Sequence, residues 1–161
     1  MAATTDTAAF LEALSGEGAL IALDVSPRRI GLAATDPGRR LVTPLATFSR
    51  RDPDRDLARI EAEVRRRGAV GLVVGYPLSM DGREGPQARM VKAFAEQLAS
   101  RLGLPVYLQD ERLTTFAVEQ AVREGRLPRP RPKGPLDHYA AAVILEDALA
   151  AFARARRQRP R

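Results

Sequence analysis

The feature that most constrains the fold is the apolar run at residues 20–25, which carries one carboxylate, Asp24, close to its end. Consecutive apolar residues with branched types among them are typical of a central strand that is covered on both faces. A turn at residues 26–29 follows, and residues 30–34 return as a second strand. A carboxylate in such a place is costly to desolvate unless it meets a cation or several donors. Asp24 therefore either forms a structural ion pair or turn cap, or binds a metal.

The segments after residue 40 alternate between strand and helix patterns. Residues 41–48 are expected to form a strand, which Pro44 restricts to a sheet edge or a bulge. A helix starting at Asp52 or Asp54, a strand at residues 69–76, a helix ending at Leu102 and a strand at residues 106–111 follow in order. Strands and helices that alternate through short connections imply parallel pairing. The sequence thus predicts an α/β fold in which two or three antiparallel strands precede parallel ones.

The length of 161 residues corresponds to one ordinary domain. We expect a peripheral N-terminal segment at residues 1–18, with at most one short helix, then the folded domain at residues 19–153 and a basic C-terminal tail at residues 154–161. A further helix is expected around residues 116–122, and the last helix begins near Asp137. The chain has no cysteine, no signal-peptide pattern and no apolar run near the ~20 residues of a membrane helix, so we expect a cytoplasmic protein.

The positive charge is concentrated at the end of the chain. Residues 121–161 hold ten basic and four acidic side chains, which accounts for the whole net charge of +6. Residues 126–135 are rich in proline and arginine, and this composition predicts a basic loop. Such a segment either binds a polyanion, most often nucleic acid, or is simply a solvated tail.

Acidic residues recur where predicted elements end or begin: Asp24, the pair Asp110 and Glu111, and Asp137 at the start of the last helix. Each has an ordinary structural alternative, as an ion pair, a surface cluster or a helix cap. Side chains of neighbouring strand residues point to opposite faces, so Asp110 and Glu111 cannot both face one site without a bulge, and the sequence does not say which does. If the acids converge, they suit Mg²⁺ or Mn²⁺, and two such ions can drive phosphodiester hydrolysis. His138, the only histidine, is expected to be a surface or packing residue.

Four segments taken together resemble a known family. They are residues 22–25 with 29–33, residues 73–82 with 84–86, residues 110–115, and Asp137 with residues 140–145. In order and spacing they are similar to the YqgF-type Holliday junction resolvase proteins of the ribonuclease H-like superfamily. One departure is Ser26, followed by Pro27, where the family usually has glycine two residues after the first acid.

The resemblance implies a mixed sheet of three antiparallel strands leading into parallel ones, flanked by helices. It also implies a divalent-metal site, with Mg²⁺ or Mn²⁺ as a pair of ions, whose ligands are Asp24, Glu111 and Asp137, with Asp110 as an additional candidate. The activity implied is hydrolysis of structured nucleic acid, either maturation of the 5′ end of small-subunit ribosomal RNA or resolution of Holliday-type DNA junctions.

Two other functions stay open from the residues alone. One is a non-catalytic nucleic-acid-binding or ribosome-assembly factor on the same fold. The other is a sugar-kinase or actin-like ATPase, which would need a second lobe that this length cannot supply. The expected partner is RNA or branched DNA and not a membrane, bound by a monomer or a homodimer. The candidate nucleic-acid-binding residues are Arg28, Arg29, Arg112, Arg126, Arg129, Arg131 and Lys133.

Overall fold

A five-stranded mixed sheet forms the centre of the computed structural model, which describes residues 2–112, 120, 122–126 and 137–158. The strand order is β3-β2-β1-β4-β5, in which β1–β2 and β2–β3 are antiparallel while β1–β4 and β4–β5 are parallel. The expected mixed sheet of three antiparallel strands followed by parallel ones is therefore confirmed. The strands are β1 (Leu20–Val25), β2 (Arg29–Thr35), β3 (Val42–Ser49), β4 (Gly71–Tyr76) and β5 (Val106–Asp110).

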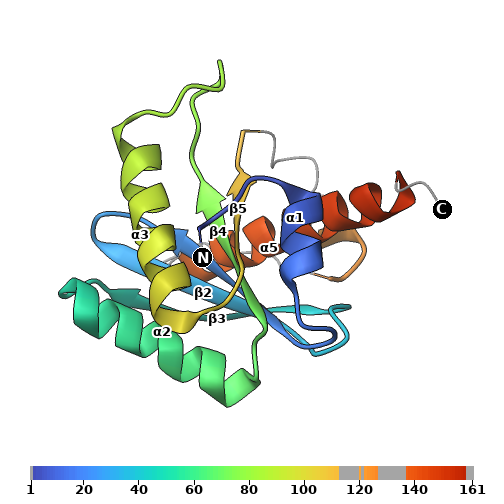
Figure 1. The fold of residues 1–161 in the computed structure, drawn as a ribbon, viewed down its shortest axis with the longest axis horizontal. Coiled ribbons are helices and arrows are strands. Elements are labelled where there is room, and N and C mark those ends of the chain that lie inside the picture. Colours follow the sequence, from blue (N-terminus) through green and yellow to red (C-terminus); the bar gives the residue numbers. More distant parts are fainter. Residues whose placement is uncertain (1, 113–119, 121, 127–136, 159–161) are drawn as a thin grey trace.

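Helices cover both faces of this sheet (Figure 1). In the figure, α2 (Pro53–Arg67) and α3 (Pro86–Leu102) lie in front, and α5 (Asp137–Arg157) lies behind. Alternating strand residues supply two separate apolar clusters. One contains Leu23 of β1 with residues of α2 and α3, and the other contains Ala22 with residues of α5. We call these the α2/α3 face and the α5 face.

The helices that connect the strands begin and end where the sequence indicates. The side chain of Asp52 accepts a hydrogen bond of 3.0 Å from the backbone N–H of Arg55 and caps α2. That helix ends at Gly68, whose left-handed backbone conformation (φ 62°) is the usual glycine terminus. Pro86 occupies the first turn of α3, and Gly103 ends that helix in the same way. These local signals fix the crossovers that bring β1, β4 and β5 together in parallel.

Strand β3 lies at the edge of the sheet and is irregular at Pro44. Its pairing with β2 shifts between Leu32, which pairs with Ala46, and Ala33, which pairs with Pro44. Both expectations for this proline, an edge strand and a bulge, are therefore met.

The N-terminal segment packs on the domain and does not lie at its periphery. Helix α1 (Thr7–Ala13) inserts Phe10 into the α5 face, where its ring lies 5.6 Å from that of Tyr107 and 5.3 Å from that of Phe152. Thr4 forms a further parallel bridge to Tyr107. Helix α1 thus contributes to the core on the α5 face, through Phe10.

Helix α5 extends to Arg157, so much of the expected basic tail is helical. The helix expected around residues 116–122 falls mostly outside the described residues. Within the described part of the chain, no helix has the length and apolar composition needed to cross a membrane.

Replacing Phe10 by alanine tests the role of the N-terminal segment. Because the ring is fully buried against two other aromatic rings, we expect Phe10→Ala to lower the free energy of unfolding by about 3–5 kcal/mol. Urea unfolding measures this loss. The matched control is Leu41→Ala, at a side chain that is 62% exposed, which should cost well under 1 kcal/mol. Equal losses from the two variants would show that residues 1–18 are peripheral after all.

Candidate active site

Asp24 lies near the carboxyl end of β1 and on the α5 face of the sheet. It follows Leu20 and Ala22 by the two-residue alternation of a strand, and Ala22 belongs to the cluster on that face. It is partly exposed although its strand neighbours are buried. Across the antiparallel pair it faces Gly31 of β2, which has no side chain to cover it. The carboxylate therefore opens toward solvent at the edge of a core.

Glu111 reaches the same face from the end of β5. Its backbone N–H donates to the carbonyl oxygen of Tyr76 at 3.3 Å, which extends the β4–β5 pairing by one residue. Its side chain packs onto Gly75 of β4. A Cβ atom on Gly75 would lie 2.9 Å from Cδ of Glu111 and 2.5 Å from Cδ1 of Ile144 in α5. The absence of a side chain at Gly75 is what leaves room for the Glu111 carboxylate beneath α5.

The electrostatics place Asp24 and Glu111 in one site. Burial is the largest cause that raises the pKa of Glu111, to about 7, and the charge of Asp24 is the second. Asp110 and Asp147 add smaller contributions of the same sign. A carboxyl group close to a second carboxylate in a poorly hydrated place resists ionisation. Two acids that are far apart in the sequence thus interact at the carboxyl ends of β1 and β5.

Asp110 faces the other way and has a different partner. It follows Val106 and Leu108, which belong to the α2/α3 face. Arg112 donates to its carboxylate from Nε at 2.8 Å and from Nη2 at 2.6 Å. These hydrogen bonds hold the pKa of Asp110 below its usual value. The choice between Asp110 and Glu111, which the sequence left open, falls on Glu111 as the residue that shares a site with Asp24.

The start of α5, which contains Asp137, is held beside this site by hydrogen bonds of His138. The side chain of Asp137 itself lies outside the described part of the chain. The backbone N–H of His138 donates to Oγ1 of Thr47 at 3.1 Å, and the same Oγ1 lies 2.8 Å from Nδ1 of the His138 ring. Thr47 pairs with Gly31, which pairs in turn with Asp24. The first turn of α5 is therefore tied to the row of strand residues that contains Asp24.

The described basic residues that were expected to bind nucleic acid lie on different elements. Arg28 and Arg29 are exposed at the β1–β2 turn, and Arg112 is engaged with Asp110. Arg126 forms ion pairs with Glu124, at 2.8 Å, and with Glu146. Arg129, Arg131 and Lys133 lie outside the described residues.

Sequence reasoning missed two kinds of residue that shape the site. The first is Gly75, and its signal was available, since a glycine inside a buried strand often marks a close approach of another group. The second is Asp147, whose pKa is raised to about 7 by burial and then by the charge of Glu146. Two adjacent acids within an apolar helix could have been noticed. Asp147 is ten residues after Asp137, so the two residues lie about 15 Å apart along the axis of α5.

The residues present fit a divalent cation. Among the described side chains no group of three or more histidine, cysteine, aspartate or glutamate residues is arranged to hold a metal ion. Asp24 and Glu111 nevertheless supply two carboxylates of one site, where the charge of Asp24 adds to burial in raising the pKa of Glu111. Carboxylate oxygens are the donors that Mg²⁺ and Mn²⁺ prefer. Asp137, at the fastened start of α5, is the expected third ligand.

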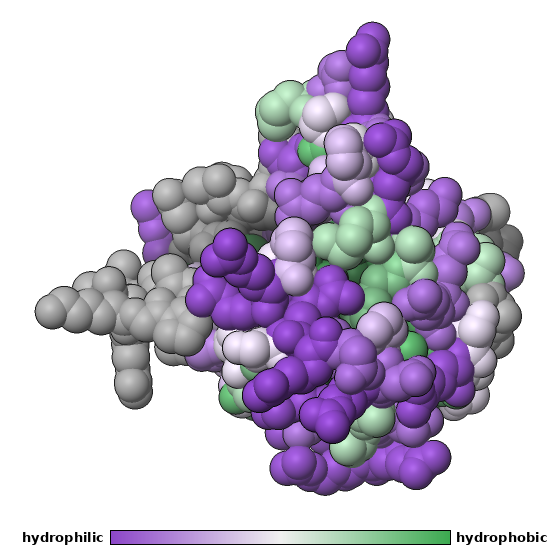
Figure 2. Space-filling model, turned by 90° about the vertical axis from the view of Figure 1, so that its left-hand side faces the viewer, coloured by the Kyte–Doolittle hydropathy of each residue, from purple (hydrophilic) through white to green (hydrophobic). Residues whose placement is uncertain are grey.

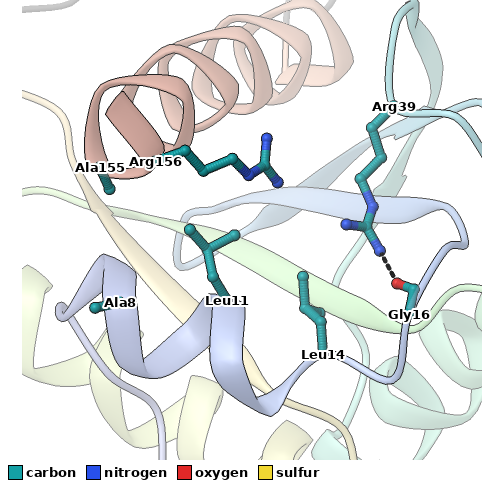
Figure 3. A pocket seen from close by; sticks show the side chains of 7 residues that line it. All are labelled: Ala8, Leu11, Leu14, Gly16, Arg39, Ala155 and Arg156. Carbon is teal, nitrogen blue, oxygen red and sulfur yellow. Dashed lines mark hydrogen bonds between the residues drawn. The ribbon is translucent and has the colours of Figure 1, made fainter. Parts of the chain in front are cut away.

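A separate hollow lies between α1 and the end of α5 (Figure 3). Leu11 and Leu14 line it together with Arg39 and Arg156, and Arg39 donates from Nη2 to the carbonyl oxygen of Gly16 at 2.7 Å. Gly16 precedes β1, so this hollow is at the opposite end of the strands from Asp24. None of its described lining residues is acidic, and it is not part of the acid site.

The raised pKa of Glu111 predicts how stability depends on pH. Between its ordinary value and about 7, the folded protein binds more protons than the unfolded chain, so stability falls as pH rises through this range. Glu111→Gln cannot ionise and should lose less stability between pH 5 and pH 8 in metal-free buffer, by about 1–3 kcal/mol. Urea unfolding at both pH values measures the difference. If wild type and variant lose the same amount, Glu111 is not held in a desolvated, acidic environment.

Comparison with known proteins agrees with this arrangement. The family model RuvX, described as Holliday junction resolvase, matches residues 18–151. A Cereibacter sphaeroides protein named "Putative pre-16S rRNA nuclease" is 46% identical over 140 residues, covering 87% of this chain and 88% of the relative. A relative from Chloroflexus aurantiacus with the same name is 45% identical over 130 residues, covering 81% and 85%.

Solved structures extend the likeness of fold. Thermus thermophilus RuvC in complex with a Holliday junction superposes with a TM-score of 0.56 at 17% identity, covering 86% of this chain and 96% of that one. The fowlpox virus Holliday junction resolvase gives 0.50 at 12% identity, covering 84% and 99%. These likenesses confirm the expected ribonuclease H-like fold. From the family model and the sequence relatives together, the chain belongs to the RuvX family.

Proposed function

We propose that this protein is a divalent-metal-dependent nuclease that hydrolyses phosphodiester bonds in structured nucleic acid, with Asp24, Glu111 and Asp137 as metal ligands. The observation that carries the proposal is the interaction of Asp24 with Glu111 on the α5 face, where burial and mutual repulsion raise the pKa of Glu111 to about 7. Such a cluster of carboxylates is unfavourable by itself and is relieved by a cation.

The chain's own residues would have three tasks in this reaction. Asp24 and Glu111 would hold the cation, for which Glu111 would have to be in its deprotonated form. Gly75 lets the Glu111 carboxylate settle between β4 and α5. Thr47 and His138 hold the first turn of α5, and with it Asp137, against the sheet. The bound metal supplies activation of water and stabilisation of the leaving oxygen.

Precursor 16S ribosomal RNA is the substrate that we propose. Support comes from the relatives at 43–46% identity, all of them named as nucleases of this RNA and matched over most of their length. Such an enzyme would act in the cytoplasm. A Holliday-type DNA junction is a second candidate, because the matching family model is described as a resolvase. Resolution of a junction would require two active sites in a symmetric dimer.

Replacing one carboxylate at a time by an amide tests which acids belong to the active site. We expect Asp24→Asn and Glu111→Gln each to reduce cleavage at least a hundredfold with binding retained, and EDTA to abolish wild-type cleavage. Asp110→Asn is the matched control, because Asp110 is held by Arg112 on the other face, and it should keep most of the activity. Single-turnover assays in Mg²⁺ or Mn²⁺ measure these rates. Cleavage that survives EDTA or either site variant would contradict the proposal.

A substrate panel decides between the two nucleic acids. We expect cleavage of an RNA that spans the 5′ end of precursor 16S ribosomal RNA, and much slower cleavage of a four-way DNA junction. The rates are compared at equal concentrations in Mg²⁺ and in Mn²⁺. Preference for the junction would make the protein a resolvase. Tight binding of the RNA without cleavage of any substrate would indicate a ribosome-assembly factor on a nuclease fold.

A further inference from the structure

A hollow of about 550 Å³ lies where the edge strand β3 passes into α2, and three arginines line it. The strand contributes Thr47, Phe48 and Ser49 to its wall. The segment after the strand and the first turns of α2 contribute Arg51, Arg55, Arg59 and the carboxylate of Asp56. We call it the arginine hollow.

Two of these arginines carry charge that no carboxylate in the described residues offsets. Arg51 and Arg59 form no ion pair there, and the guanidinium of Arg59 lies over the ring of Phe48 at 4.6 Å. Arg55 has only a loose, exposed contact of 3.7 Å with Asp52.

The far end of α2 provides a contrast. Arg66 and Arg67 form ion pairs with Glu63 at 2.8 Å and 3.2 Å. These arginines differ from Arg51 and Arg59, which form no ion pair with a described carboxylate.

The one acid in the wall of the arginine hollow is already satisfied. The side chain of Asp56 is 3% exposed and accepts hydrogen bonds from Nε of Arg50 at 3.3 Å and from the backbone N–H of Arg51 at 3.0 Å. Its charge is compensated by Arg50, and its second bond fixes the backbone from which the Arg51 side chain projects. Three arginines and one aspartate line the hollow, so its lining carries a net positive charge.

The edge strand β3 links the arginine hollow to the acid site. Thr47 lines the hollow and also bonds His138, the residue after Asp137. Thr47 lies two strands from Asp24 along one row of paired residues, through Gly31, which is a distance of about 10 Å. Ser49, also in the wall, pairs with Arg29 at the β1–β2 turn.

The side of the molecule that contains the start of α2 is largely hydrophilic. Figure 2 shows the side of the molecule on which α2 begins in Figure 1, and hydrophilic side chains cover most of it around a smaller hydrophobic area.

We propose that the arginine hollow binds the phosphodiester backbone of the nucleic acid on one side of the bond that is cleaved at Asp24 and Glu111. This inference rests on the proposed function. Guanidinium groups recognise phosphate through paired hydrogen bonds as well as charge. Contacts of this kind position a strand without reading its sequence. The strand would leave the acid site past Thr47 and follow the edge of the sheet along the arginines.

The test measures binding separately from cleavage. Fluorescence anisotropy in the Glu111→Gln background follows binding of a labelled RNA that spans the 5′ end of precursor 16S ribosomal RNA, over a series of salt concentrations. We expect Arg51→Ala with Arg59→Gln to weaken binding at least tenfold and to reduce the slope of log K against log salt by nearly two. Arg66 and Arg67, which pair with Glu63, are the matched control; changed to alanine together, they should alter neither quantity.

Two further measurements keep the result decisive. Arg51→Glu alone, at an exposed side chain, should weaken binding without changing the unfolding transition. This variant keeps the contact of Arg59 with Phe48, so weaker binding cannot be attributed to loss of that contact. Unchanged affinity and slope in the double variant, or no RNA binding by the parent, would overturn the inference. If the wild-type protein cleaves nothing but its binding depends on Arg51 and Arg59, the hollow stands and the nuclease proposal falls.

Discussion

The candidate site depends on one close contact, in which the carboxylate of Glu111 lies on the bare backbone of Gly75 beneath α5. Any side chain at Gly75 would occupy the volume that this carboxylate fills. The contact removes Glu111 from water next to Asp24, and these two effects raise its pKa to about 7. Near neutral pH the protein alone can keep a proton on Glu111, so the fold tolerates two adjacent acids. A cation that replaces that proton would turn a destabilising pair into a binding site.

The two faces of the sheet give neighbouring residues unrelated roles. Asp110 and Glu111 are adjacent in the chain, but one is neutralised by Arg112 and the other interacts with Asp24. The α5 face also carries the contact of Thr47 with His138. Ile144 of α5 packs at Gly75 beside Glu111, while Phe152, farther along the same helix, packs on Phe10 and Tyr107.

The sequence predicted what local signals determine and failed where distant segments decide. The strand that carries Asp24, the cap at Asp52 and the terminus at Gly68 follow from patterns within a few residues. Strand alternation places Asp110 and Glu111 on opposite faces of the sheet. Which of the two faces α5, however, depends on the side of the sheet on which each helix packs. Phe10 lies in a helix of seven residues, too short to show periodicity, so its burial could not be read. Asp137 as a third ligand is still a prediction.

The distribution of charged residues also shows what the sequence alone could not predict. Residues 1–120 hold equal numbers of basic and acidic side chains, which drew attention to the basic C-terminal quarter as the contact with nucleic acid. Electrostatic effects at the surface are screened over about 8–10 Å, so a sum over 120 residues says little about any one place. In the fold, the acids gather at the carboxyl ends of β1 and β5 while Arg51 and Arg59 collect beside the edge strand. A chain segment with no net charge can therefore place two acids together at one end of the sheet and arginines without a described ion-pair partner beside its edge strand.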